Sequence, residues 1–177
     1  FGAGLIKLRG DPCWRDLTCL YYHYETQPIP SPISRYLHFA PLWFHKFEVI
    51  WNHFVELIVP WFSFGPRTAR HIAGVLLVTF QIFLIISGNL SFLNYLTIIP
   101  FLACFDDTFL GRFLPRSIVK RAQEAAQNSP PSRIHNGIAV ALTIVVIWLS
   151  IPTVLNLASG RQLMNYSYDP LDLVNTY

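Results

Sequence analysis

Residues 41–64 read PLWFHKFEVIWNHFVELIVPWFSF, and this stretch decides the class of the protein. It is long enough for the roughly 20 residues of helix that cross the core of a bilayer. It nevertheless carries several polar side chains, and at about 100° per residue they fall in one narrow stripe. The stripe consists of His45, Glu48, Asn52 and Glu56. The opposite face is apolar and aromatic, so the pattern predicts an amphipathic helix at membrane depth.

The composition of the whole chain agrees with a membrane protein. Hydrophobic residues make up 53% of the 177 residues and charged residues only 13%, which is too apolar for an ordinary soluble domain. The formal net charge of +3 is too small to indicate a nucleic-acid partner. The chain begins with Phe1 rather than Met, and we expect it to be a piece of a longer polypeptide. By their number, we expect these 177 residues to form one compact unit.

Three more apolar stretches follow, at residues 72–86, 92–105 and 138–157. The last has the length of a membrane span, the first nearly does, and the middle one is short. Pro100 is expected to kink that middle stretch. The sequence therefore predicts an all-α fold, a multi-span transmembrane helix bundle of four spans with short loops on the far side of the membrane.

The basic residues predict the orientation of the bundle. The connections 65–71 and 106–137 are rich in Arg and Lys, whereas the turn SGNLS at 87–91 carries no charge. Basic connections usually lie in the cytosol, which places SGNLS on the far side. Three regions follow: a far-side loop at 1–37, a bundle at 38–157 and a far-side region at 158–177. Within 106–137 we expect a short amphipathic helix and then a Ser/Pro linker.

The polar stripe has two interpretations. Titratable side chains at membrane depth often serve a proton, ion, metal or small-ligand site, and His and Glu recur here three residues apart. The alternative is an internal polar seam that joins one helix to its neighbours. Glu48 and Glu56 are about 12 Å apart on a helix, so they would not share one metal ion without a partner helix.

Cys13 and Cys19 are candidates for a disulfide, because a small loop with five residues between its cysteines is geometrically allowed on an oxidising face. The alternative is two unpaired thiols. Their spacing is not that of a CxxC exchange motif. Cys104 is expected to serve packing.

Two Asn-x-Ser sequons occur, at Asn89 and Asn165. Asn89 lies in a turn too tight to leave the bilayer, so we expect it to stay unmodified. Asn165 is better separated from its span and is the candidate N-glycosylation site.

The stretch HYETQPIPSP at 23–32 leads towards the first span. An extended chain would place His23 and Glu25 on one face and Tyr24 on the other, and the three prolines would exclude a helix before the membrane. We interpret the stretch as a stiff, aromatic contact surface rather than a reaction centre. The alternative is a loop that folds back and caps the bundle.

Several blocks together resemble the lipase maturation factor family. They are GLIKLRGDPCWRDLTC, HYETQPIPSP, WFHKFE, NHFVELIVPWF, SGNLSFLNYLT, LACFDDTFLG and the closing LNLASGRQLMNYSYDPLDLVNTY. The resemblance runs over essentially the whole chain. It implies a multi-pass protein of the endoplasmic reticulum membrane with five spans, of which this chain would contain the last four. A first span would precede it, and a large lumenal domain would follow.

The resemblance also implies a function. Members of the family are needed for lipoprotein, hepatic and endothelial lipase to fold, assemble as dimers and be exported, so we expect a non-enzymatic folding factor without cofactor, metal or catalytic residues. Its partners would be secreted lipases, with lumenal chaperones or oxidoreductases and membrane lipid beside them. The candidate residues for client contact are Tyr22, His23, Tyr24, Glu25, Gly88, Asn89 and Phe92. The alternative function is a membrane-embedded enzyme or carrier that uses the polar stripe.

Overall fold

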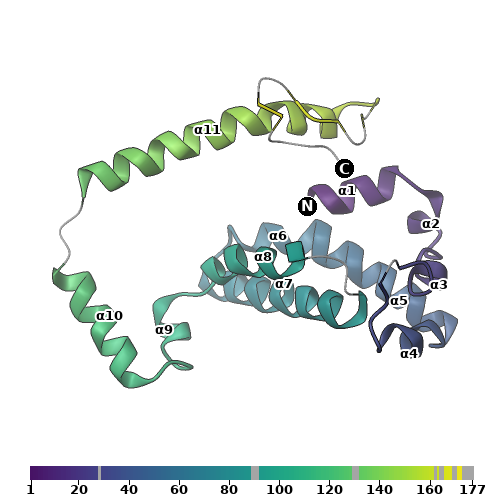
Figure 1. The fold of residues 1–177 in the computed structure, drawn as a ribbon, viewed down its shortest axis with the longest axis horizontal. Helices are drawn as coiled ribbons and strands as arrows, with labels where there is room; N and C mark the ends of the chain where they lie inside the picture. Colours follow the sequence, from purple (N-terminus) through teal and green to yellow (C-terminus); the bar gives the residue numbers. More distant parts are fainter. Residues whose placement is uncertain are drawn as a thin grey trace. The chain divides into compact units, whose positions relative to one another are not determined.

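A computed structural model describes residues 1–27, 29–88, 92–128, 132–161, 163, 166–168 and 171–172. Over these residues the chain is mostly helical and contains no strand, which confirms the predicted all-α class (Figure 1). The chain divides into two units, Phe1–Leu110 and Gly111–Tyr177, so the one compact unit expected from its length is wrong.

Among the described residues, two helices are long and apolar enough to cross a membrane, α7 (Arg67–Gly88) and α11 (Arg133–Ala158). The apolar segment Phe92–Cys104 is shorter; it consists of α8 (Phe92–Phe101) and a 3₁₀ turn, η2 (Leu102–Cys104). Length and hydropathy thus identify two of the four predicted spans.

The stretch that contains the polar stripe is helical without a break. It forms α5 (Leu42–His53), the π-helical turn η1 (Phe54–Ile58) and α6 (Val59–Phe62). Its polar face is buried, whereas Phe47 and Ile50 on the apolar face are exposed. A helix of a soluble domain turns its apolar stripe inwards, so this reversed pattern is typical of a helix surrounded by lipid.

Helix α7 begins earlier than the apolar stretch that predicted it. The expected loop at 65–71 is wrong in extent, because α7 starts at Arg67, directly after Pro66. Likewise α11 starts at Arg133, inside the expected connection 106–137. Hydropathy marks where a helix is apolar, whereas the backbone continues as helix into polar residues until a proline or a cap ends it.

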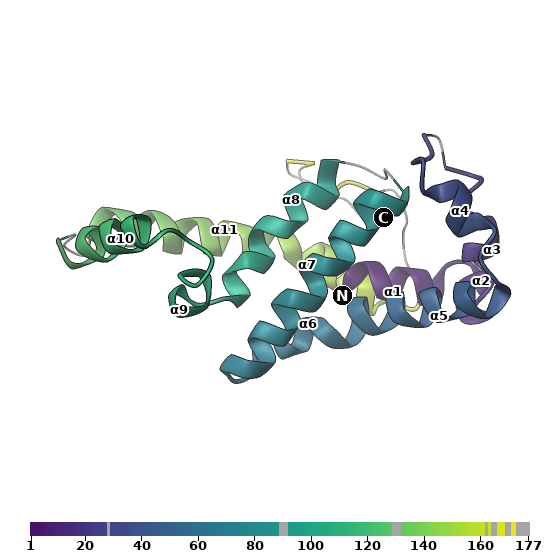
Figure 2. The same cartoon turned by 90° about the horizontal axis from the view of Figure 1, so that it is seen from below.

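The stretch at 23–32 is not the extended segment that the sequence predicted, because His23 ends a helix and Tyr24 has helical backbone dihedrals. The described residues before position 39 are partly helical. They form four short helices: α1 (Gly2–Arg9), α2 (Pro12–Arg15), α3 (Leu20–His23) and α4 (Ser34–His38). A proline restricts only itself and the residue before it, so helical turns on either side of the proline run remain allowed. Helix α1 packs against η1, and α3 packs against α5 (Figures 1 and 2).

The core of this unit lies between the α5–η1–α6 segment and α7. Its buried members are Val55, Val59, Ala73, Leu77 and Phe80. Gly74 brings α7 close to η2, since a Cβ atom there would lie 2.7 Å from Phe105 Cζ.

The polar end of α7 is joined to the short helix α9 (Asp107–Leu110). Arg67 pairs with Asp106, and both contact the Thr108 hydroxyl. Asp106 also caps α9 by accepting the Phe109 amide at 2.8 Å. The Thr108 hydroxyl and the Arg67 guanidinium hold the pKa of Asp106 well below its usual range. This carboxylate therefore has a structural role.

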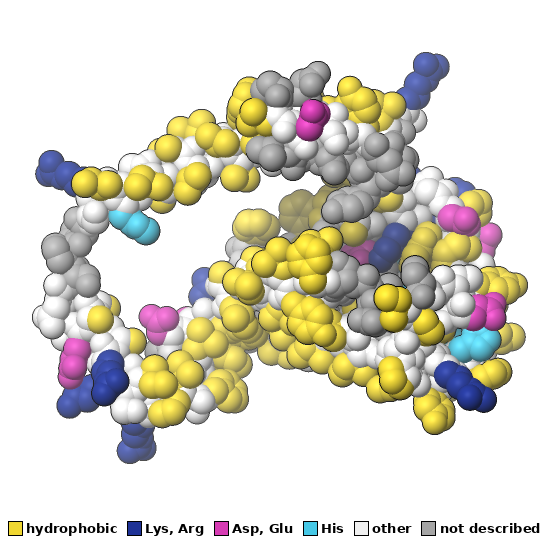
Figure 3. Space-filling view, viewed as in Figure 1, with side chains coloured by type: hydrophobic (Ala, Val, Ile, Leu, Met, Phe, Trp, Pro, Cys, Tyr) yellow, Lys and Arg dark blue, Asp and Glu magenta, His cyan; other side chains and the backbone are white. Residues whose placement is uncertain are grey.

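The second unit contains α10 (Arg116–Asn128) and α11. Helix α10 is amphipathic and follows the expectation for this connection. Side chains along α11 are hydrophobic and largely exposed (Figure 3). Near its end, Asn156 is buried and exchanges hydrogen bonds with the backbone of Leu163, at 2.8 and 3.0 Å.

Candidate functional site

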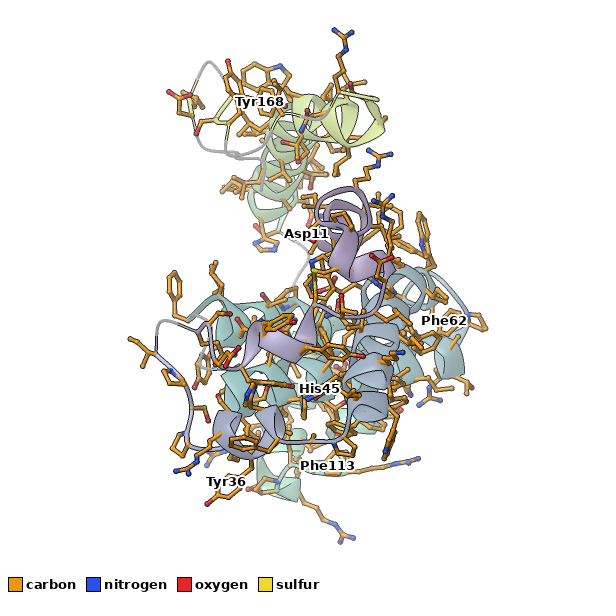
Figure 4. All side chains as sticks on the ribbon, turned by 90° about the vertical axis from the view of Figure 1, so that its right-hand side faces the viewer. Asp11, Tyr36, His45, Phe62, Phe113 and Tyr168 are labelled. Carbon is orange, nitrogen blue, oxygen red and sulfur yellow. A yellow bond between two sulfur atoms is a disulfide. The ribbon has the colours of Figure 1, made fainter. Side chains whose placement is uncertain are left out.

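The polar stripe of α5 faces the N-terminal helices and forms a polar seam with them. His45 is only 2% exposed, and Glu48 and Asn52 are also buried. Figure 4 shows His45 among the helices, whereas Tyr36 and Phe62 project at the edges. Three of the four predicted stripe residues are thus buried together, and Glu56 at the π-helical turn is half-buried.

The first part of the polar seam is a chain of hydrogen bonds around Glu48. The Tyr24 hydroxyl donates to Glu48 Oε1 at 2.6 Å, and His45 Nδ1 lies 3.2 Å from Glu48 Oε2. His45 Nε2 faces the His38 carbonyl at 3.3 Å, which requires a proton on that nitrogen. Burial and the Glu48 contact raise the pKa of Tyr24, so its hydroxyl stays protonated as a donor.

The second part surrounds Glu56. Lys7 Nζ donates to Glu56 Oε1 at 2.6 Å and to Asn52 Oδ1 at 3.0 Å, and it lies 4.9 Å from the centre of the Trp14 ring. The charge of Glu56 is therefore compensated from α1. This contact needs a close approach of α1 to η1, which Gly4 permits: a Cβ atom there would lie 2.8 Å from Leu57 Cδ2.

A disulfide loop holds Trp14 over the polar seam. Cys13 and Cys19 are bonded, with their Cα atoms 4.8 Å apart. Asp11 starts the loop by accepting the Cys13 amide at 2.8 Å, as an N-cap of α2. His53 Nε2 donates to the Trp14 carbonyl at 3.0 Å. The loop thus meets α5 through His53 and meets α1 through the Lys7–Trp14 contact.

Hydrogen bonds also tie the N-terminal segment to the end of α7. Gln27 Nε2 lies 3.1 Å from His23 Nε2, and Ser34 Oγ lies 3.1 Å from Gln27 Oε1. Ser34 Oγ is 2.5 Å from the Ser87 carbonyl. Burial lowers the pKa of His23, which favours the neutral ring that accepts the amide proton. The stretch 22–25, which is expected to contact clients, is therefore linked through three side chains to Ser87, the residue before Gly88.

The predicted contact residues differ in accessibility. Tyr22 is 64% exposed and Phe92 is 74% exposed, and Glu25 is exposed as well. Tyr24 and Gly88 are buried, which gives them internal packing roles. His23 is half-buried. Asn89 and the sequon residue Asn165 lie outside the described residues.

Sequence reasoning missed several residues that complete this site. Lys7, Gln27 and Ser34 each bridge elements that are far apart in the chain. Lys7 carried a usable signal, since it is a lone charge within the apolar run GAGLIKL. Gln27 and Ser34 lie in a proline-rich stretch where polar residues are ordinary, so nothing in the pattern marked them.

The described residues contain no group of three or more His, Cys, Asp or Glu side chains placed to hold a metal ion. The ionisable groups of the polar seam instead contact one another or the backbone. Their hydrogen bonds and ion pairs attach the N-terminal helices to the α5–η1–α6 segment.

Comparison with known proteins gives a consistent result. Residues 1–112 match the family model described as the lipase maturation factor transmembrane domain. Lipase maturation factor 1 of Mus musculus is 53% identical over 189 residues, which cover 99% of this chain and 33% of that protein. The Homo sapiens protein of the same name is 51% identical, with 99% and 33% covered.

More distant relatives match a shorter part. Lipase maturation factor 2 of Gallus gallus is 40% identical over 127 residues, which cover 71% of this chain and 18% of the relative. No solved structure matches the chain. The chain spans about a third of the length of the lipase maturation factor 1 relatives.

Proposed function

The chain belongs to the lipase maturation factor family, and from this premise we propose that it is the membrane part of a folding factor for secreted lipases. The observation that carries the proposal is the match over 99% of the chain with proteins named lipase maturation factor 1. The clients that the family resemblance implies are lipoprotein, hepatic and endothelial lipase. The factor would help them fold, assemble as dimers and leave the endoplasmic reticulum.

We further propose a multi-pass position in the endoplasmic reticulum membrane. The four spans would be the α5–η1–α6 segment, α7, the α8–η2 segment and α11. The N-terminal segment and the residues after α11 would then be lumenal, and the connections before α7 and α11 cytosolic. Basic residues in these connections support the orientation. The reversed burial of α5, with its polar face inside, supports a lipid environment.

The factor would act by binding rather than by catalysis. Tyr24 and Lys7 contact the polar stripe from the N-terminal helices, and the disulfide loop contacts His53 beside the stripe. Glu48 and Glu56 pair with Tyr24 and Lys7 within the protein. These contacts therefore favour a structural role for the stripe: it holds the N-terminal helices α1 to α4, called the lumenal segment below, against the membrane helices.

Client contact would use a lumenal aromatic surface. We define it as the exposed apolar residues Tyr22, Ile29, Ile33, Tyr36 and Phe39. The α4 region that carries Tyr36 and Phe39 is tied to the end of α7 through Ser34. Exposed Phe92, at the start of α8, would extend the surface across that link. Rigid aromatic side chains offer large contact area at low entropic cost, as expected for binding to partly folded clients.

A double substitution tests this surface. In full-length protein expressed in cells without their own copy, Tyr36→Ala with Phe39→Ala should reduce lipase co-capture and secreted lipase activity together. The control is Phe64→Ala, because Phe64 is 86% exposed but lies before α7 on the proposed cytosolic side. Equal lipase secretion from the double variant, at normal protein level, would refute the lumenal aromatic surface.

A further inference from the structure

A cavity of about 480 Å³ lies beside the polar seam, between the N-terminal helices, α5 and α7. Aromatic rings dominate its wall, including Trp14 from the disulfide loop, Phe44 and Trp51 from α5, and Phe80 from α7. Its volume falls in the range of pockets that enclose one small organic molecule. Neither the family match nor the polar seam accounts for such a space.

The charged groups on the wall are already engaged. Lys7 pairs with Glu56 and Asn52, and Glu48 contacts Tyr24 and His45. The Thr79 hydroxyl donates to the backbone of its own helix at 2.7 Å. A charged ligand would have to break these contacts or lose its own hydration without compensation. The wall therefore favours an uncharged, hydrocarbon ligand.

The wall also reaches the outer surface of the membrane helices. Phe47 on α5 is 52% exposed and Phe83 on α7 is 40% exposed, yet both line the cavity, as does exposed Thr79. In the proposed topology these surfaces face the bilayer. The cavity thus extends from a lipid-facing rim on α5 and α7 to Trp14 and Leu20 of the lumenal segment.

We propose that this cavity binds the hydrocarbon chain of one membrane phospholipid, which enters between Phe47 and Phe83. The proposal rests on the membrane location in the proposed function. The chain fills the space between the lumenal segment and the spans, and its head group stays outside the rim. The bound lipid thereby stabilises the packing of the N-terminal region, which carries the lumenal aromatic surface, against α5 and α7.

Photolabelling of the full-length protein in lipid nanodiscs tests the site. The probe is phosphatidylcholine with a diazirine at the end of one acyl chain, and labelled peptides are mapped by mass spectrometry. Trp14 and Leu20 line the cavity from the N-terminal helices, and Trp14 also contacts His53 in the middle of the α5–η1–α6 segment, so a chain end inside the cavity lies next to both residues. We expect labels at these two residues, and excess unlabelled phosphatidylcholine should compete for them.

Paired variants strengthen the test. Thr79→Phe narrows the rim, whereas Val75→Phe adds the same ring one turn away at an exposed position outside the wall. Labelling of Trp14 and Leu20 should fall several-fold with Thr79→Phe and stay unchanged with Val75→Phe. If Thr79→Phe does not fold, the labelled peptides of the wild-type protein and the competition by unlabelled phosphatidylcholine still test the site. Labels confined to outward faces of the spans would overturn the proposal, as would labelling by a photoreactive sterol in place of the phospholipid.

Lipase secretion, measured in parallel, separates this proposal from the proposed function. Normal secretion without labels at Trp14 and Leu20 overturns only the lipid site. Labels at both residues, together with a wild-type protein that secretes no lipase, overturn only the folding-factor function and support the lipid site.

Discussion

At the scale of single residues, burial decides what each polar side chain does. Tyr22 and Tyr24 are two positions apart, but Tyr22 is 64% exposed and Tyr24 only 4%. The hydroxyl of Tyr24 donates to Glu48 at 2.6 Å. A buried carboxylate oxygen that loses its donor is costly, so this bond contributes to the stability of the lumenal segment on α5.

Tyr24→Phe should therefore destabilise the protein, whereas Tyr22→Phe should not. The change removes only the hydroxyl and leaves Glu48 Oε1 without its donor, which costs about 1–2 kcal/mol. Thermal unfolding of the two purified variants measures the difference. Equal melting temperatures would contradict the structural role of the Tyr24–Glu48 bond. Loss of lipase maturation at unchanged stability would instead favour chemistry at the polar seam.

At the scale of elements, two devices hold the helices at close range: glycines at helix contacts and the disulfide loop. Gly74 lets α7 approach η2, and Gly4 lets α1 approach η1. The disulfide keeps Trp14 near Lys7 and His53. Each device acts where a membrane helix meets a neighbour, and small residues are the usual means of such contacts in membranes.

Gly74→Ala should weaken the contact between α7 and η2. The new methyl group would lie 2.7 Å from Phe105 Cζ and 2.9 Å from Cys104 Cβ, so the helices must separate, at a cost of about 1–3 kcal/mol. Gly137→Ala in α11 is the matched control, because nothing lies within 4 Å of its added Cβ. There the better helix propensity of alanine should stabilise by about 1 kcal/mol. Chemical unfolding that shows the same sign for both variants would contradict this packing.

Replacing both Cys13 and Cys19 with serine should loosen the lumenal segment. Without the disulfide the unfolded chain gains conformational entropy, which lowers the free energy of unfolding by about 2 kcal/mol for so small a loop. We expect faster proteolysis between α1 and α3 and a lower melting temperature. Cys104→Ser lies outside the loop and should leave the proteolysis rate near residues 10–20 unchanged. An unaltered cleavage pattern in the double variant would show that the loop is held without the disulfide.

At the scale of the whole molecule, the proposed topology connects the two units. Unit Phe1–Leu110 carries the polar seam, the cavity and α7, whereas unit Gly111–Tyr177 carries the apolar helix α11. In that topology, four spans would return the chain to the lumen after α11. The lumenal segment and the residues after Ala158 then share one compartment.

Single exposed cysteines test this arrangement in sealed microsomes that contain the full-length protein. Arg35→Cys and Arg161→Cys should react with a membrane-impermeant maleimide only after the membrane is permeabilised. Arg121→Cys on α10 should react at once, since the proposed topology places its connection in the cytosol. All three positions are exposed, so accessibility within the fold is matched. Reaction of Arg161→Cys without permeabilisation would exclude the four-span layout.

Much of the fold followed from local patterns. The apolar stretches predicted the long helices, since hydropathy and length are properties of a segment by itself. The 3.6-residue period predicted that His45, Glu48 and Asn52 share a face, and the structure buries them together. The helix starts at Arg67 and Arg133 were missed, because the apolar window says little about where backbone hydrogen bonds begin.

What the sequence by itself determined is therefore the helical class, the stripe on α5 and the family. Only the tertiary structure decided what the stripe faces. Lys7 and Tyr24 reach it from segments up to 49 residues away. The cavity arises between the N-terminal helices, α5 and α7. The physical reason is that periodicity specifies which side of a helix a residue occupies, whereas its partner is chosen by packing between distant segments.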